Sequence, residues 1–373
     1  MIKRFCVAAI AMAASAAWVS AALAEEPGLR NLPAAEKPRF DITDPDWPAE
    51  PGKASICLWR DDKLAAVSFT IDDNTVPDHA WWVEQSQKYG FKFTWFVITA
   101  RVHSGNPYFG EWTDFEKLRA AGHDVQSHTV DHFNPTLNRN LGTDDNYRIA
   151  IDELEKGLPG AKIRTLAYPG GPNAKNDSAI AAKYYIAARQ TRSILNPVNR
   201  VDYMNVNSVG NGLSIDGSSG TAIQWLITQG GRHAQIYRGW GCQHFHGLEN
   251  PKEPEKSAKL QAAKVLEYLG EHKADFWVGT FTDVAMYGQE RDTATLSASA
   301  EGSAIKLSIA DKMDDMLFDA PLTVKVRLDP SWANAVARHG DEKVDVQVIE
   351  HGGAKYALVP VVPDRGEVLL SPQ

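Results

Sequence analysis

The sequence has few cysteines, no cluster of basic residues and no apolar run long enough for a permanent membrane anchor. Its 373 residues include 3 cysteines and carry a formal net charge of −8. Because Lys and Arg form no block, the charge pattern argues against a nucleic-acid partner and against an electrostatic membrane anchor. Cys6 lies in the N-terminal segment described next. Cys57 and Cys242 are therefore the two thiols that could pair in an oxidising compartment, and the sequence leaves that pairing open.

An apolar run lies at the N-terminus. Lys3 and Arg4 precede an Ala-rich run at residues 5–19, and Ala22 and Ala24 supply small residues at the two positions that a signal peptidase reads. The run is short for a membrane-spanning helix. We therefore expect residues 1–24 to be a cleaved signal peptide and the protein to be secreted or periplasmic, without a membrane anchor.

The remaining chain begins with an arm and continues as an alternating pattern. Residues 25–63 are rich in Pro and charge and predict an extended N-terminal arm with a short strand. Between residues 64 and 290, strand-like and helical segments alternate about seven times. This alternation is typical of βα units around a parallel sheet, and polar residues at the strand ends favour a distorted (β/α)7-type barrel over an open sheet.

Beyond residue 290 the apolar period changes to two. The alternating segments are separated by Gly and Asp turns, and helix signals are absent. We expect residues 291–373 to form a small all-β, sandwich-like domain. The expected strands include residues 296–300, 305–309, 322–326, 344–348 and 356–362.

Two adjacent carboxylates follow a β-branched and aromatic strand. The run at residues 68–71 ends at Asp72, Asp73 and Asn74. Catalytic groups of α/β folds tend to lie at this junction. Because side chains alternate along a strand, one carboxylate could hold a cation while the other handles a proton. A solvated turn that closes the strand is the alternative interpretation.

A pair of histidines follows another predicted strand. His128 and His132 are four residues apart, directly after the strand at residues 123–126. Both rings would project from one face if a helix began there. Two imidazoles and a carboxylate suit Zn²⁺ or a similar divalent ion. Two surface histidines at helical spacing are the alternative, but the carboxylates upstream favour a metal site.

These motifs resemble those of the polysaccharide deacetylases, carbohydrate esterase family four. Residues 70–74 and 127–132 are similar to the first two family motifs, Thr-Phe-Asp-Asp-Gly and His-Ser/Thr-x-x-His. Residues 166–171 are a looser match to the third motif, an Arg-x-Pro-Tyr type loop. Residues 245–248 match the fifth, an apolar strand that ends on a His. The resemblance covers the chain from residue 64 to about residue 287.

The resemblance implies a distorted barrel with one divalent metal ion, with Zn²⁺ preferred over Co²⁺ or Ni²⁺. It assigns Asp73, His128 and His132 as the metal ligands. Asp72 would be the general base that takes a proton from the attacking water. A backbone N–H near Tyr168 would bind the oxyanion.

The resemblance also implies a general acid in the His-rich strand near residue 245. The resemblance favours His246, which would protonate the leaving amine or alcohol, because His-Gly-Leu lies where the last strand of the family ends. His244, two residues earlier on the same strand face, is the alternative. Trp240 lies near this motif, and its ring could line a sugar-binding cleft or belong to the core.

The sequence departs from the family pattern at three places. Asn74 replaces Gly, which is tolerable because Asn accepts left-handed backbone conformations. Ala167 stands where the family Arg orients the base, so another group must hold Asp72. Arg189 could serve near the site or form a structural salt bridge. The fourth motif, an Asp and Trp pair that positions the acid, has only a weak match at Asp202.

Together these residues predict a metal-dependent hydrolase that removes acetyl groups from a carbohydrate polymer or oligomer, by N- or O-deacetylation. Two other classes stay open. The missing Arg leaves room for a catalytically impaired relative that only binds glycan. Another kind of barrel metal hydrolase would need further His or Asp ligands, and the sequence shows no second cluster of them. The partner is therefore an acetylated carbohydrate, with the glycan and the oligomeric state left open.

Overall fold

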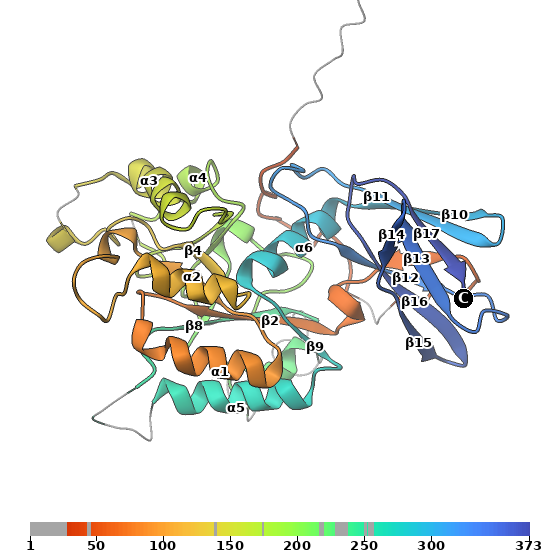
Figure 1. Ribbon diagram of the computed structural model, residues 1–373, viewed down its shortest axis with the longest axis horizontal. Helices are drawn as coiled ribbons and strands as arrows, with labels where there is room; N and C mark the ends of the chain where they lie inside the picture. The colour runs from red at the N-terminus through yellow and green to blue at the C-terminus, as the bar shows by residue number, and fades with distance from the viewer. Residues whose placement is uncertain are drawn as a thin grey trace, which may run out of the picture.

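The computed structural model describes residues 28–42, 46–137, 140–173, 175–215, 220–227, 238–249, 252 and 257–373. The expected signal peptide lies outside these residues. The chain forms two bodies, a curled parallel sheet with helices and an all-β body, and helix α6 lies between them (Figure 1).

One parallel sheet of eight strands forms the first body. Its strand order is β6-β5-β4-β3-β2-β8-β7, and β9 also pairs with β2. A parallel bridge between Arg189 of β6 and Val206, which precedes β7, brings the two edges toward each other. The predicted distorted barrel is therefore confirmed. The strands are β2 (Ala65–Ile71), β3 (Thr94–Val97), β4 (Asp124–Ser127), β5 (Thr165–Ala167), β6 (Ala187–Arg189), β7 (Val209–Gly210), β8 (Trp240–Phe245) and β9 (Phe276–Val278).

Local sequence explains the barrel elements. All seven residues of β2 are buried, as expected of a parallel strand covered on both faces. Gly90, at a φ of 76°, ends α1 in a left-handed cap. Between β7 and β8, the described residues 220–227 include one 3-10 turn, Ile223–Leu226. The helices are α1 (His79–Tyr89), α2 (Trp112–Ala120), α3 (Thr143–Gly157), α4 (Ser178–Ala181), α5 (Ala258–Glu271) and α6 (Phe281–Thr293).

Two antiparallel sheets form the second body, as the period-two pattern predicted. Their strand orders are β1-β12-β16-β15 and β10-β11-β17-β13-β14. Strand β1 precedes the barrel in sequence but pairs with β12. The strand expected at residues 344–348 is split between β14 and β15. The strands are β1 (Ala54–Ile56), β10 (Thr295–Glu301), β11 (Ala304–Ala310), β12 (Leu322–Arg327), β13 (Ala335–His339), β14 (Glu342–Val344), β15 (Gln347–His351), β16 (Ala354–Val361) and β17 (Val368–Pro372).

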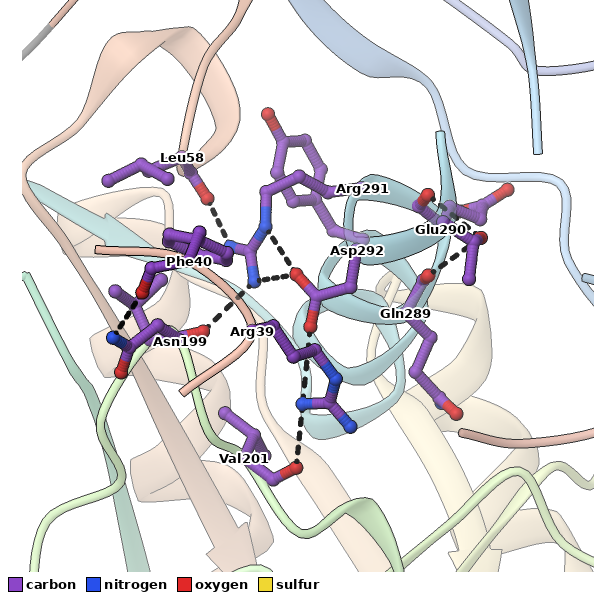
Figure 2. A network of polar contacts seen from close by, with 12 residues as sticks. Arg39, Phe40, Leu58, Asn199, Val201, Gln289, Glu290, Arg291 and Asp292 are labelled. Carbon is purple, nitrogen blue, oxygen red and sulfur yellow. Dashed lines mark hydrogen bonds and ion pairs between the residues drawn. The ribbon is translucent and has the colours of Figure 1, made fainter. Parts of the chain in front are cut away.

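Buried charges at the end of α6 connect this helix to the N-terminal arm, to Leu58 and to the barrel residue Val198. Arg291 donates to the carbonyl oxygens of Leu58 at 2.6 Å and Val198 at 3.1 Å, and to Asp292 Oδ1 at 2.6 Å (Figure 2). Arg39 of the arm pairs with Asp292 Oδ2 at 3.4 Å. The side chains of Arg291 and Asp292 are 4% and 0% exposed, so this junction is a buried and paired network.

The two cysteines that could pair do not do so. Cys57 and Cys242 are both buried and both free. Burial raises the pKa of the Cys242 thiol to about 12, so this thiol is unreactive near neutral pH. In the part of the chain that the structure describes, no helix combines the length and apolarity needed to cross a membrane.

Candidate metal centre and active site

Four barrel strands place the predicted residues at one edge of the sheet. Asp72 follows β2, His128 follows β4, Arg189 ends β6 and His246 follows β8. Because the strands are parallel, their carboxyl ends meet at this edge. The contact is direct between β2 and β8, where the N–H of Asp72 donates to the carbonyl oxygen of Phe245 at 2.9 Å.

The two adjacent carboxylates have different surroundings. The side chain of Asp72 is 3% exposed, whereas that of Asp73 is 35% exposed. Asp73 and Asn74 have φ values of 63° and 59°, which are left-handed. The chain therefore turns sharply after β2, and the turn separates a buried carboxylate from an accessible one.

Asp73, His128 and His132 form a cluster suited to a divalent cation. Their ligand atoms all lie within 4.8 Å of one another. The Nε2 atoms of His128 and His132 are 3.5 and 3.7 Å from Asp73 Oδ1. That oxygen is buried and has no hydrogen-bond partner among the described residues. A bound cation would satisfy it.

The orientation of His128 also fits a metal ligand. Its Nδ1 lies 2.8 Å from the carbonyl oxygen of Ala167. A carbonyl oxygen only accepts, so Nδ1 carries a proton, and Nε2 faces Asp73, where it can hold either a second proton or a metal ion. A lone pair and a carboxylate oxygen repel each other unless a cation or a proton lies between them. The donor set therefore fits Zn²⁺ or a similar ion.

The two histidines converge through a loop, and no helix begins at this point. Thr129 and His132 have φ values of 69° and 56°, outside the helical region. The N–H of His132 donates to Thr129 Oγ1 at 3.0 Å, and the N–H of Thr129 donates to Ser127 Oγ at 3.2 Å. The helical interpretation of the His128 and His132 spacing is therefore wrong, although the rings do meet, with centroids 4.8 Å apart.

The charges of this cluster favour cation binding. Burial raises the pKa of Asp73, but His128 and His132 outweigh burial and hold it well below its usual range. Burial, aided by His128, lowers the pKa of His132 to about 4. Near neutral pH the cluster therefore offers an ionised carboxylate and a neutral imidazole at position 132, the forms that bind a metal.

Arg189 takes the place of the arginine that is missing at Ala167. The two residues are register partners on the neighbouring strands β5 and β6. Arg189 Nη2 donates to Asp72 Oδ2, and the paired side chains are 0% and 3% exposed. Burial raises the pKa of Asp72, but the Arg189 guanidinium outweighs it, so the net pKa is lowered. The arginine expected on one strand is thus supplied by the next.

The two histidines of the last motif differ in exposure. His246 Nε2 is 3.9 Å from Asp72 Oδ2 and 3.9 Å from Asp73 Oδ2, and its side chain is 51% exposed. His244 is buried, and burial, followed by the charge of Arg189, lowers its pKa to about 4. His244 is therefore unprotonated near neutral pH, and His246 is better placed to donate a proton.

Three residues considered for the site serve the fold instead. The N–H of Tyr168 donates to the carbonyl oxygen of Arg189 at 2.9 Å, and its hydroxyl donates to that of Met204 at 3.0 Å. Tyr168 itself therefore has no donor left for an oxyanion, and a backbone N–H near it stays the prediction. Trp240 is fully buried, so it lines no cleft. Asp202 caps a 3-10 turn by accepting from the N–H of Met204 at 3.2 Å.

Sequence reasoning missed the hydrogen bonds of Asn74, and it missed Tyr108 altogether. Asn74 is buried; its Nδ2 donates to the carbonyl oxygens of Ile98 at 3.2 Å and Phe109 at 3.4 Å, and its Oδ1 accepts from the N–H of Ile98 at 2.8 Å. The hydroxyl of Tyr108 lies close to Gly247. Each contact joins loops that follow different strands, so no local sequence pattern signals it.

The fold and the site together define the class of protein. A curled parallel sheet carries an Asp and two His at the carboxyl ends of its strands, with an Asp–Arg pair beside them. Residues 60–188 match a family model described as polysaccharide deacetylase. This part of the barrel therefore matches the polysaccharide deacetylases, the family that the sequence motifs resemble.

Individual relatives add the following similarities. Over 368 residues the chain is 35% identical to a gellan lyase from Bacillus sp.; the match covers 92% of this chain but only 14% of the length of that protein. The chain is also similar to the solved structure of the Streptococcus pyogenes deacetylase PplD in complex with acetate, with 22% identity over 38% of this chain and 62% of that one, at a TM-score of 0.33. A polysaccharide deacetylase from Bacillus cereus shows 18% identity over 38% of this chain and 45% of that one, at a TM-score of 0.31.

Proposed function

We propose that this protein is a metal-dependent hydrolase that removes acetyl groups from a carbohydrate polymer or oligomer. One observation carries the proposal: Asp73, His128 and His132 converge within 4.8 Å, next to the buried Asp72–Arg189 pair. The match of residues 60–188 to the deacetylase family model supports the reaction class. We propose Zn²⁺ as the ion, because two imidazoles and a carboxylate suit it, with Co²⁺ or Ni²⁺ as substitutes.

Asp72 has the features of the general base. A divalent cation held by Asp73 and the two histidines would supply Lewis-acid activation of water and of the acetyl carbonyl. Arg189 holds Oδ2 of Asp72, while Oδ1 is buried without a partner among the described residues. Because the pKa of Asp72 is lowered, Oδ1 is ionised near neutral pH and able to take the proton that the attacking water loses.

His246 is the proposed general acid. As the water oxygen bonds to the acetyl carbon, the bond from that carbon to the nitrogen or oxygen of the sugar breaks. His246 gives its proton to that leaving atom, so the products are acetate and a free amine or hydroxyl. Its half-exposed ring, within 3.9 Å of both carboxylates, lies where a bound sugar could be reached.

The name of one relative supports the substrate class, and the N-terminal residues support the location. The relative named gellan lyase is named for a polysaccharide, which favours a carbohydrate substrate. Its lyase activity is not carried over, since the chain spans 14% of that protein. We also propose a secreted or periplasmic location, on the strength of the signal-like residues 1–24.

The two alternative functions have less support. The impaired, glycan-binding relative was suggested by the missing arginine, and Arg189 does contact Asp72. Another type of barrel hydrolase would need more ligands. Among the described residues, the cluster of Asp73, His128 and His132 is the one group of three His, Cys, Asp or Glu able to hold a metal.

Acetate release tests the proposal. The protein should release acetate from a panel of acetylated glycans or from a generic acetyl ester. A chelator should abolish the activity, and Zn²⁺ or Co²⁺ should restore it. Asp72→Asn should lower kcat by about 10²–10⁴-fold while the protein still binds metal. Full activity of Asp72→Asn would overturn the base assignment, and chelator-resistant acetate release would overturn the metal assignment.

A further inference from the structure

An exposed tyrosine stands beside the proposed acid. Tyr108 is 38% exposed in the loop between β3 and α2. A Cβ added to Gly247 would lie 3.1 Å from its hydroxyl oxygen, so the phenol sits directly against the residue that follows His246. Burial, followed by the charges of Asp78 and Asp73, raises the pKa of Tyr108, which agrees with a position near the carboxylates.

The loop that carries Tyr108 is fixed to the catalytic turn. The N–H of Val76 donates to the carbonyl oxygen of Tyr108 at 3.1 Å, and Asn74 Nδ2 donates to that of Phe109 at 3.4 Å. The ring of Phe109 is covered by the Arg101 guanidinium, 4.2 Å from the ring centroid. Phe109 is therefore the anchor of the loop, and Tyr108 is the aromatic residue left exposed.

The segment after His246 is fixed to the same turn. Asp78 Oδ2 accepts from the N–H of Leu248 at 2.9 Å. The loop of Tyr108 and the loop of His246 are thus both held by the stretch that follows Asp73. One backbone contact and the side chains of Asn74 and Asp78 therefore set the position of the two loops relative to each other.

The proposed chemistry requires a sugar at this place. In a deacetylation the leaving atom belongs to the sugar, so the sugar must lie beside the acid that protonates it. Aromatic faces bind the apolar face of a pyranose ring, and few rotatable bonds make tyrosine inexpensive to order. We propose that Tyr108 is a substrate-positioning residue, whose exposed ring binds the pyranose that carries the leaving nitrogen or oxygen next to His246. This inference rests on the proposed function.

Direct binding tests the inference apart from catalysis. Asp72→Asn and Asp72→Asn/Tyr108→Ala would be titrated with two probes, N-acetylated chitotetraose and O-acetylated xylo-oligosaccharides. We expect Tyr108→Ala to weaken binding of at least one probe about tenfold, near the upper end for one aromatic contact. Tyr108→Phe should stay within about threefold of Tyr108, because the ring remains. Equal affinities with and without the ring, or no measurable binding of either probe, would overturn the inference.

Kinetics on the otherwise unchanged protein supply the second readout. Tyr108→Ala should raise KM for the bound oligosaccharide about tenfold, with a much smaller change in kcat. Leu369→Ala is the matched control, since Leu369 is also 38% exposed but lies in β17 of the all-β body. An equal loss for both variants, or a loss in kcat alone, would refute positioning. Wild-type protein that binds a probe without releasing acetate would refute the proposed function but leave this inference to the titration.

Discussion

Two buried arginine–aspartate pairs in this molecule differ in what surrounds them. At the α6 junction, each guanidinium nitrogen of Arg291 has an acceptor, and Asp292 also meets Arg39 (Figure 2). At the carboxyl edge of the barrel, Arg189 Nε and Nη1 and Asp72 Oδ1 are buried without partners among the described residues. Both pairs are buried. We call the first pair closed, because every nitrogen of the Arg291 guanidinium has an acceptor, and the second pair open, because atoms of Arg189 and Asp72 lack partners among the described residues.

The difference shows that burial of charge does not by itself mark a functional site. A buried polar atom without a partner costs about 1–3 kcal/mol, so a fold keeps several of them in one place only if something else uses them. Each guanidinium nitrogen of Arg291 donates a hydrogen bond that stabilises the fold. Asp72 and Asp73 each keep an oxygen open, and both oxygens belong to the site proposed to bind the cation and the attacking water.

Replacing each arginine in turn should separate these two roles most sharply. Arg189→Gln should lower kcat about 10²-fold or more, because Asp72 loses the charge that keeps it ionised and oriented. Arg291→Gln should lower the free energy of unfolding by about 3–5 kcal/mol, since it breaks a buried pair, but should leave the kcat of the folded protein unchanged. Urea unfolding and acetate release, measured on both variants, check this. A similar loss of kcat in Arg291→Gln would contradict the comparison.

Glu290 tests whether a buried polar atom without a hydrogen-bond partner always marks a functional site. It neighbours Arg291 on α6, and its Oε2 is buried without a partner among the described residues. Burial, followed by Asp311 and Asp319, raises its pKa from 4.5 to about 9. Between these two values the folded protein binds more protons than the unfolded chain, so stability should fall as pH rises, by at most about 1.4 kcal/mol per pH unit.

Glu290→Gln should remove this pH dependence. The stability gain of the variant over wild type should grow from pH 5 to pH 8, as measured by urea unfolding, while acetate release stays unchanged. Parallel stability curves would show that Glu290 is ionised in the folded protein. A loss of acetate release would show that a buried atom without a partner at the α6 junction also contributes to catalysis.

The sequence predicted the site where its signals are local. The strand that ends at Asp72 and Asp73, and the close pair of His128 and His132, come from short patterns. The left-handed turn that joins the two histidines was missed because helical spacing suggested a helix. The Arg189 partnership could be named only as an option, since register between β5 and β6 decides which strand supplies the arginine. Tyr108 was missed because the contacts of its loop lie between loops.

Moving the arginine back to the position that the family resemblance suggests is the next test. Ala167 and Arg189 are register partners, so a guanidinium from either strand starts at the same level of the barrel. Arg189→Ala should lose about 10²-fold in kcat, and Ala167→Arg added to it should recover about tenfold. Ala167→Arg alone is the control and should destabilise, because it adds a second buried charge. No recovery in the double variant would show that the open nitrogens of Arg189 matter beyond its charge.

Substitution of Asn74 should have the smallest effect, and it tests whether the Asn74 side chain fixes the loop that carries Tyr108. Asn74→Gly keeps a residue that tolerates the φ of 59° but removes the hydrogen bonds to Ile98 and Phe109, so the free energy of unfolding should fall by about 1–2 kcal/mol. Asn74→Ala loses the same bonds and adds the cost of a left-handed backbone, about 1 kcal/mol more. If the hydrogen bonds also hold the Tyr108 loop, both variants should raise KM for an oligosaccharide by a similar factor, whatever their difference in stability. A KM that instead follows the stability loss would mean that the backbone turn, and not the Asn74 side chain, fixes the position of the Tyr108 loop.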